Sequence, residues 1–385
     1  MADRPEILLF VIDAGGGHRA AANALTAAAE RTGRPWSFRT LNLQSLLDHL
    51  DFTKHLTGHP MEEAYNAFLR RRWTSGFGLL LKILHGLIAL LHRPLTASLA
   101  RSLSAYHPVA FVSVLPNFNG VIRDAVRAAC PGVPFLVVLT DLADFPPRFW
   151  IEPGIDRVIV GTEHAAGQAR AIGLPPERIS LTSGMVLHPR FYPPPGVEIR
   201  AAFRAERGIP PDAFVLLLLF GGKGSPEMHP LTAALLREPP PWHVVAICGD
   251  NPRLYERLET LEAEAGGRLH RVGFTDRVAD HLAACDLLVT KPGPGSLSEA
   301  FHLGVPVVVV RDRHTIPQER FNTDFVAERE LGVVVRHWRQ IAPAAAALAG
   351  DPERMARMRA NVAALPPNRA IWEVLDIIEK ERRRP

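Results

Sequence analysis

The segment that decides the fold is 288–322, which reads LVTKPGPGSLSEAFHLGVPVVVVRDRHTIPQERFN. It opens within an apolar run, 287–289, of the kind that forms a buried strand, and a second such run spans 305–310. Between the two runs, prolines and glycines predict a tight turn before Ser296. Glu299 follows three residues later, and this capping-box spacing predicts that a helix starts here. The predicted unit is strand, turn, helix and strand, and the helix N-terminus favours a phosphate.

Each of these features also has a purely structural interpretation. Ser296 and Glu299 could do nothing but cap the helix, and the glycines could only form a turn. A second polar group favours a binding role, because Gln318, Glu319 and Asn322 follow the next strand, in a loop predicted beside the same turn. Loops at the carboxyl ends of parallel strands line the ligand crevice of an open α/β sheet. Amide and carboxylate groups in such a loop can bind sugar hydroxyls by directional hydrogen bonds.

Taken together, these residues resemble the C-terminal donor-binding region of the family 28 glycosyltransferases. That family includes monogalactosyldiacylglycerol synthases, processive diacylglycerol glucosyltransferases and the N-acetylglucosaminyltransferase that forms lipid II. Its pattern is a Gly/Pro turn, a Ser or Thr, a helical Glu, then a Gln-Glu or Gln-Gln pair and an Asn. The resemblance implies that Glu299 accepts hydrogen bonds from two ribose hydroxyls. It implies that a UDP-sugar binds at Gly293, Pro294, Gly295, Ser296, Glu299, Gln318, Glu319 and Asn322.

A second glycine-rich turn lies near the N-terminus. An apolar run at 6–12 predicts a strand, DAGGGH follows at 13–18, and an Ala-rich helix is expected over 19–31. The glycines are contiguous, so the dinucleotide-binding spacing is absent, and a simple turn is the structural alternative. The motif resembles the N-terminal Gly-rich motif of the same lipid glycosyltransferases, which has a His at this place. The resemblance implies that Gly16 and Gly17 approach a ligand closely and that His18 is the general base.

Three further sites follow strands. Asp141 ends the predicted strand 134–139, where active-site residues collect, although a cap is the structural alternative. The loop 221–225 follows the strand 214–220 without P-loop spacing and resembles the family's first donor-domain Gly loop. There Gly222 and Lys223 would meet the diphosphate, unless the lysine is only solvated. Phe274 and Thr275 follow another strand, and the resemblance implies that they border the uracil ring.

The span 64–123 contains Arg and Lys but no Asp or Glu. Its apolar stretch, 76–91, is too short to cross a bilayer as one helix, so a helix lying on an anionic membrane is predicted. A buried core helix is the alternative, and no nucleic-acid motif accompanies the positive charge, so no nucleic-acid partner is expected. The residues expected at the membrane are Arg70, Arg71, Arg72, Trp73, Lys82 and Arg93.

Composition limits the class of protein and its compartment. The 385 residues are 47% hydrophobic and carry a net charge of +4, which suits a two-domain globular protein. The three cysteines show no metal or disulfide spacing, and the N-terminus has no signal peptide, so we expect a peripheral protein at the cytoplasmic face of the cell membrane. The resemblance implies no essential metal in the donor site, and no D-x-D-type metal motif appears in the sequence. No cofactor is expected, since UDP-sugar is a co-substrate.

The expected fold is α/β, two Rossmann-like domains facing a cleft, of the type called GT-B. Prolines at 193–195 mark the boundary. The expected parts are an acceptor and membrane-side domain at 1–192, a linker at 193–200, a UDP-sugar domain at 201–365 and a returning helix at 366–385. The resemblance implies an inverting transferase that moves galactose or glucose from UDP to a lipid hydroxyl such as that of diacylglycerol. Three alternatives stay open: a UDP-N-acetylglucosamine transferase acting on a polyprenyl-linked or other lipid, a UDP-sugar epimerase, and a non-catalytic membrane-bound protein that binds a sugar nucleotide.

Overall fold

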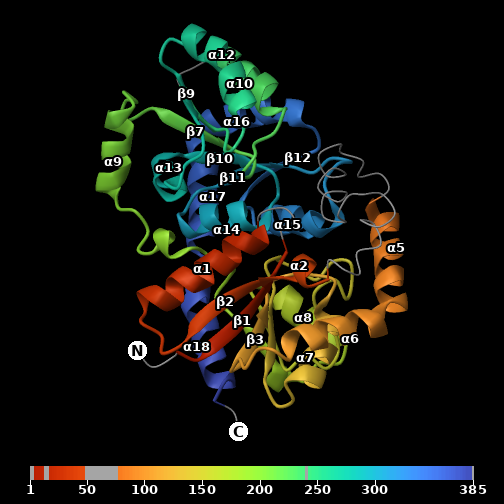
Figure 1. The fold of residues 1–385 in the computed structure, drawn as a ribbon. Coiled ribbons are helices and arrows are strands. Elements are labelled where there is room, and N and C mark those ends of the chain that lie inside the picture. Colours follow the sequence, from red (N-terminus) through yellow and green to blue (C-terminus); the bar gives the residue numbers. More distant parts are fainter. Residues whose placement is uncertain (1–3, 13–16, 48–76, 239–241, 384–385) are drawn as a thin grey trace. The chain divides into compact units, whose positions relative to one another are not determined.

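The chain folds into two compact units. In the computed structural model, residues 4–12, 17–47, 77–238 and 242–383 are described. The first unit comprises 1–189, 316–318 and 368–385, and the second comprises 190–315 and 319–367. Each unit contains one parallel six-stranded sheet with its own hydrophobic core (Figure 1). The α/β class and the two Rossmann-like domains predicted from the sequence are confirmed.

The first unit has the strand order β2-β1-β3-β4-β5-β6. The central strands are short apolar runs buried on both faces, as expected where helices cover both sides of a parallel sheet. The order reverses between β1 and β3, so the loops after these two strands diverge at a topological switch point. The strands are β1 Glu6–Val11, β2 Ser37–Asn42, β3 Ala110–Ser113, β4 Phe135–Val138, β5 Arg157–Val160 and β6 Ile179–Leu181.

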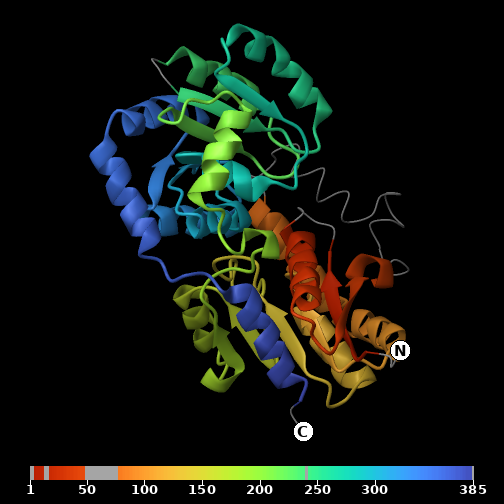
Figure 2. The ribbon, with the colours of Figure 1, turned by 90° about the vertical axis from the view of Figure 1, so that its left-hand side faces the viewer.

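The last helix of the chain belongs to the first unit, where it lies beside α1 (Figure 2). Its apolar residues Ile371, Leu375 and Ile378 are buried at helical spacing. A buried ion pair between Arg157 of β5 and Glu381 fixes its end. The helices of this unit are α1 Gly17–Arg31, α2 Leu43–Leu47, α5 Phe77–Leu90, α6 His92–Leu103, α7 Asn119–Ala129, α8 Glu163–Ala171 and α18 Ala370–Glu381.

The second unit has the order β12-β11-β10-β7-β8-β9, the strand order of a Rossmann fold. Its switch point lies between β7 and β10. The strands are β7 Phe214–Leu219, β8 Trp242–Ile247, β9 Leu269–Val272, β10 Leu287–Thr290, β11 Val307–Val310 and β12 Gly332–Val335. The helices are α9 Val197–Glu206, α10 Met228–Arg237, α11 Pro252–Arg257, α12 Glu259–Glu264, α13 Val278–Ala284, α14 Pro294–His302, α15 Pro317–Glu328, α16 Ile341–Ala349 and α17 Pro352–Ala363.

Two local predictions were wrong, and the predicted linker 193–200 includes helical residues. Helix α14 begins at Pro294 with Gly293 as its N-cap residue, so Ser296 lies inside the helix and forms no capping box with Glu299. Proline at the first helical position already has the required φ, so the helix starts earlier than the serine. Gln318, Glu319 and Asn322 belong to helix α15 and not to a loop. Residues 197–200 of the predicted linker form the first turn of α9.

Candidate functional site

The candidate base His18 lies in the first turn of α1, directly after β1. Its Nδ1 is 2.8 Å from the carbonyl oxygen of Val114, which follows β3, and 3.3 Å from Oγ1 of Thr140. A carbonyl oxygen can only accept, so Nδ1 carries the proton and donates it to Val114. The second nitrogen, Nε2, therefore keeps its lone pair and is the basic atom. The side chain is thus held between the two strands that form the switch point of this unit.

Burial sets the protonation state of this imidazole. It lowers the pKa of His18 to about 4, while the hydrogen bond to Val114 acts in the opposite, weaker direction. The ring is therefore neutral at physiological pH, as a proton acceptor must be.

Asp141 does not contact His18 directly. Its Oδ2 accepts the indole N–H of Trp150 at 2.8 Å, and the Trp150 ring lies 5.7 Å from the His18 ring, centroid to centroid. Within the described part of the chain, Asp141 makes no hydrogen bond to His18. Burial raises the pKa of Asp141 to about 6, although the indole N–H favours the ionised form.

Asp144 organises the loop that carries Trp150. Its carboxylate accepts the main-chain N–H groups of Trp150 at 2.7 Å and of Arg148 at 3.0 Å. Gln168 of α8 holds the same residue, donating to its carbonyl and accepting its N–H. Burial raises the pKa of Asp144 to about 6. The Asp144 carboxylate hydrogen-bonds the main chain of this loop. Its role is therefore to position the loop residue Trp150 beside His18.

In the second unit, the loop after β7 is tightly folded. Gly221 and Gly224 have positive φ, and Gly224 N–H closes a turn on the carbonyl of Gly221 at 3.1 Å. A Cβ on Gly249 would lie 2.2 Å from the carbonyl oxygen of Gly222, so only glycine fits there. Gly222 and the predicted diphosphate ligand Lys223 are exposed at the tip of this loop.

The N-terminus of α14 follows β10 on the other side of the same switch point. No side chain caps it, because Gly293 has none to offer and Pro294 lacks an N–H. The main-chain N–H groups of Gly295 and Ser296 lie in its first turn, where the helix dipole favours an anion. Thr290, at the end of β10, donates a 2.6 Å hydrogen bond to the carbonyl of Leu219 at the end of β7. The glycine loop and the helix start are thereby held side by side.

Glu299 lies on α14, half-buried, and its environment is unusual for a carboxylate. Its side chain makes no hydrogen bond to any residue that the structure describes. Burial raises its pKa to about 7, and the charge of Arg190 acts in the opposite, weaker direction. A carboxylate in this setting lacks donors, which is what the predicted pair of ribose hydroxyls would provide.

The first turns of α15 lie against the turn before α14. Asn322 is buried, and its Nδ2 donates to the carbonyl of Pro292 at 2.7 Å. Oε1 of Glu319 lies 3.8 Å from the position of a Cβ on Gly293, which brings this carboxylate to the helix start. Gln318 is buried as well, and its Oε1 accepts no hydrogen bond among the described residues.

Phe274 and Thr275 follow β9. The Phe274 side chain is 78% exposed, which is unusual for a large aromatic residue and fits a surface on which a base could stack. Thr275 has a local role, because its Oγ1 accepts the N–H of Arg277 at 3.0 Å.

Several predicted residues lie partly or wholly outside the described residues. These are Gly16, Arg70, Arg71, Arg72, Trp73 and the side chain of Lys82. Arg93 is exposed in α6. No single helix in the described ranges is long and apolar enough to cross a membrane. The consecutive helical segments Ile83–Leu90 and His92–Leu103, which meet at a bend of 66°, are long and apolar enough only when they are counted together. The described residues contain no group of three or more His, Cys, Asp or Glu that could hold a metal ion.

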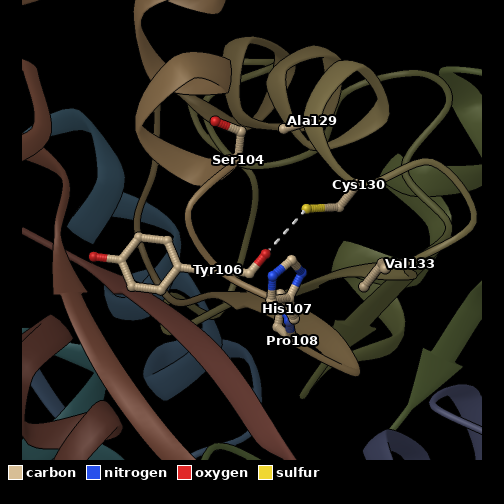
Figure 3. A pocket seen from close by; sticks show the side chains of 7 residues that line it. All are labelled: Ser104, Tyr106, His107, Pro108, Ala129, Cys130 and Val133. Atoms are coloured by element: carbon tan, nitrogen blue, oxygen red, sulfur yellow. Dashed lines mark hydrogen bonds between the residues drawn. The ribbon is translucent and has the colours of Figure 1, made fainter.

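A small pocket in the first unit is unrelated to these residues. It is lined by residues that precede β3 and β4 in the chain (Figure 3). These residues lie at the amino edge of the sheet, whereas His18 follows the carboxyl end of β1. Its most reactive side chain, Cys130, is 4.0 Å from the carbonyl of Tyr106, and burial raises the pKa of the thiol. A raised pKa makes this thiol a poor nucleophile.

Comparison with known proteins gives relatives over the whole length of the chain. The chain is 26% identical to monogalactosyldiacylglycerol synthase 1 of Arabidopsis thaliana over 404 residues, which is 100% of this chain and 72% of that protein. It is 26% identical to the processive diacylglycerol beta-glucosyltransferase of Bacillus subtilis over 277 residues, 72% of this chain and 70% of that protein. No protein-family model matches the sequence.

Solved structures share the fold. MurG of Acinetobacter baumannii superimposes with a TM-score of 0.63 at 16% identity, covering 98% of this chain and 100% of that chain. The chain is a glycosyltransferase of the GT-B fold. A UDP-GlcNAc 2-epimerase of Neisseria meningitidis has the same fold, with a TM-score of 0.59 at 13% identity over 97% of this chain and 100% of that chain. The fold therefore does not by itself distinguish a transferase from an epimerase, whereas the two relatives by sequence named above are a monogalactosyldiacylglycerol synthase and a diacylglycerol glucosyltransferase.

For this glycosyltransferase, sequence reasoning missed the groups that hold His18. Val114 contributes a main-chain carbonyl, which has no signature in the sequence. Trp150 and Asp144 lie in the segment LTDLADFPPRFW, where two acids and a tryptophan follow a strand that ends near the switch point. The place of this segment after a strand end was the only sequence feature that pointed to a role for Trp150 and Asp144.

Proposed function

We propose that this GT-B enzyme transfers galactose or glucose from a UDP-sugar to a membrane lipid hydroxyl, with diacylglycerol as the acceptor and inversion at the anomeric carbon. The observation that carries the proposal is the likeness over most of the chain to two kinds of enzyme that are both named for diacylglycerol. The immediate surroundings of His18, Glu299 and the α14 N-terminus support it, because each has the chemistry that such a transfer requires.

In this proposal the acceptor hydroxyl is activated from the first unit. Nε2 of His18 takes the hydroxyl proton while the oxygen forms a bond to the anomeric carbon. The bond from that carbon to the UDP oxygen breaks on the opposite face, so configuration inverts and UDP leaves with the electron pair. His18 ends the step protonated on both nitrogens, and its Nδ1–H remains bonded to Val114.

The second unit binds the donor. The first-turn N–H groups of α14 and the loop 221–224 stabilise the charge that develops on the leaving diphosphate, assisted by Lys223. Glu299 accepts the ribose hydroxyls, Phe274 and Thr275 border the uracil, and Gln318 and Glu319 contact the hexose. Asn322 serves this site by holding the turn before α14, because its Nδ2 donates to the carbonyl of Pro292.

The acceptor is membrane-borne, so we propose that α5 lies on the inner face of the cell membrane. One side of this helix packs into the core through Leu81, with Leu84 and Ile88 beside it. The other side presents Ile83 and Leu90, which are 59% and 78% exposed. A helix with an exposed apolar side, within a span that has no acidic residue, suits an anionic lipid surface.

One experiment tests the function against its alternatives. Purified protein is incubated with a lipid extract and radiolabelled UDP-galactose, UDP-glucose or UDP-N-acetylglucosamine, and labelled lipids are identified by mass spectrometry. The proposal expects a glycosylated diacylglycerol from one of the first two donors. Label that appears only in a polyprenyl-linked lipid, or an epimerised UDP-sugar with no labelled lipid, would contradict it.

A further inference from the structure

Trp150 is fixed at every polar atom that it has. Its N–H donates to Asp144 Oδ1 at 2.7 Å, its carbonyl accepts from Asn119 Nδ2 at 2.8 Å, and its indole N–H donates to Asp141 Oδ2 at 2.8 Å. The side chain is fully buried. Asn119 is buried too and is bonded to Ser113 at the end of β3. A tryptophan with three satisfied polar groups and no exposed surface cannot reorient without breaking several bonds.

This immobile ring lies beside the candidate base. The imidazole of His18 is 5.7 Å from the indole, centroid to centroid, with a tilt of 54° between the rings. The hydrogen bond to Val114 fixes the position of Nδ1 of His18. The neighbouring indole restricts rotation of the imidazole ring about that bond. The direction of the Nε2 lone pair follows from these two restraints together.

We propose that Trp150 is a positioning residue for His18, and that Asp141 acts on the reaction only by holding the Trp150 indole. This inference rests on the proposed function of His18. It replaces the interpretation of Asp141 as a catalytic group, because the only hydrogen bond that the described residues give its side chain is to Trp150. We therefore expect activity to survive replacement of the Asp141 carboxylate by another hydrogen-bond acceptor, but not by an apolar group.

The test compares three variants that differ in this one hydrogen bond. D141N keeps an acceptor oxygen, D141L removes it, and W150F keeps a buried aromatic ring but removes the donor. Because small displacements of a catalytic group cost about 10- to 100-fold, D141L and W150F should each lower kcat by that factor, with the KM for UDP-sugar unchanged. D141N should recover at least about tenfold over D141L. The double variant D141L/W150F should be no slower than the worse single variant, because both remove the same bond.

A second readout does not depend on turnover. The titration of His18 is followed by NMR of histidine-labelled protein, with H18A used to assign the signal. Loosening of the Trp150 ring should admit water and raise the pKa of His18 in D141L and W150F, while D141N should titrate like the unaltered protein.

Two results would overturn the inference. Loss of kcat in D141N equal to that in D141L would show that the charge of Asp141 is required. An unchanged His18 titration in folded D141L and W150F would show that Trp150 only fills the core. Absence of transfer by the unaltered protein would contradict the proposed function separately, because the NMR titration would still report whether Trp150 holds the imidazole.

Discussion

Asn322 of α15 donates a 2.7 Å hydrogen bond to the main-chain carbonyl of Pro292, which opens the turn before α14. Asn322 is fully buried, so this bond helps to fix the position of the turn. The residue that the sequence suggested as a sugar ligand thus serves first to hold the phosphate-binding helix start in place. Its effect on donor binding should be mediated by that turn.

N322A should destabilise the protein and weaken UDP binding together. The carbonyl of Pro292 would lose its partner in a buried site, at a cost of about 1–3 kcal/mol in the free energy of unfolding. The matched control is T323V, which removes a buried hydroxyl whose 2.7 Å hydrogen bond to Arg320 stays within α15. Thermal unfolding and calorimetry with UDP measure both quantities. Equal UDP affinity in N322A and T323V would show that the turn does not depend on Asn322.

E299Q should separate stability from binding. The pKa of Glu299 in the folded protein is about 7, above its ordinary value of 4.5, so the folded state disfavours the ionised form. Its contribution to stability is therefore present below pH 4.5 and is lost as pH rises through 7. E299Q should melt at a higher temperature than the unaltered protein at pH 8, and the difference should shrink towards pH 5.

The same substitution should weaken UDP binding at pH 8, because a neutral amide accepts ribose hydroxyls less strongly than a carboxylate. For the unaltered protein, UDP affinity should fall as pH is lowered through about 7. Calorimetry at pH 8 and pH 6 measures this. An E299Q variant that is more stable and binds UDP normally would remove Glu299 from the donor site.

The pH dependence of kcat, measured with UDP-sugar at saturation so that Glu299 is held in its ligand-bound state, should report a base of low pKa. His18 must be neutral to accept a proton, and burial lowers its pKa to about 4, so kcat should be lost only as pH falls through that value. An apparent pKa of about 6.5 on the acidic side of the pH–rate profile would indicate an ordinary, solvated histidine. An apparent pKa of about 6 would indicate that ionised Asp141 or Asp144 is required, since their pKa values are about 6.

Membrane binding should depend on the outer side of α5. Replacing Ile83 and Leu90 by Ser removes exposed apolar surface and should lower liposome partition by about tenfold or more, without changing UDP affinity. V197S is the matched control, since Val197 is 81% exposed in the second unit. Flotation with liposomes of varied anionic content measures the effect. Equal partition of the double variant and the control would place the membrane contact elsewhere.

Charge should contribute as well. Arg70, Arg71 and Arg72 changed together to Ser should cost about 3 kcal/mol of affinity for anionic liposomes, about 1 kcal/mol each, with the loss greatest at low salt. Binding that ignores both lipid charge and this triple substitution would contradict the contribution of the basic residues.

The alternation of strands and helices could be predicted from the sequence because buried parallel strands are short apolar runs, such as Phe214–Leu219, bounded by glycine and proline. The start of α14 could not, because Pro294 and Ser296 both offer a helix start and local pattern does not rank them. The surroundings of His18 were also hidden. They are built from the carbonyl of Val114 and the indole of Trp150, which come together only through the order of strands in the sheet.

We propose that this chain moves a hexose from UDP to diacylglycerol with His18 as the base, and one assay measures both parts of this proposal. Liposomes with diacylglycerol as the sole acceptor are supplied with labelled UDP-galactose or UDP-glucose as the donor, and the unaltered protein is compared with H18A. We expect a labelled β-linked glycosyldiacylglycerol, formed about 10²–10⁴-fold more slowly by H18A, which should bind UDP normally. Near-normal turnover by H18A, or no labelled diacylglycerol from either donor, would contradict it.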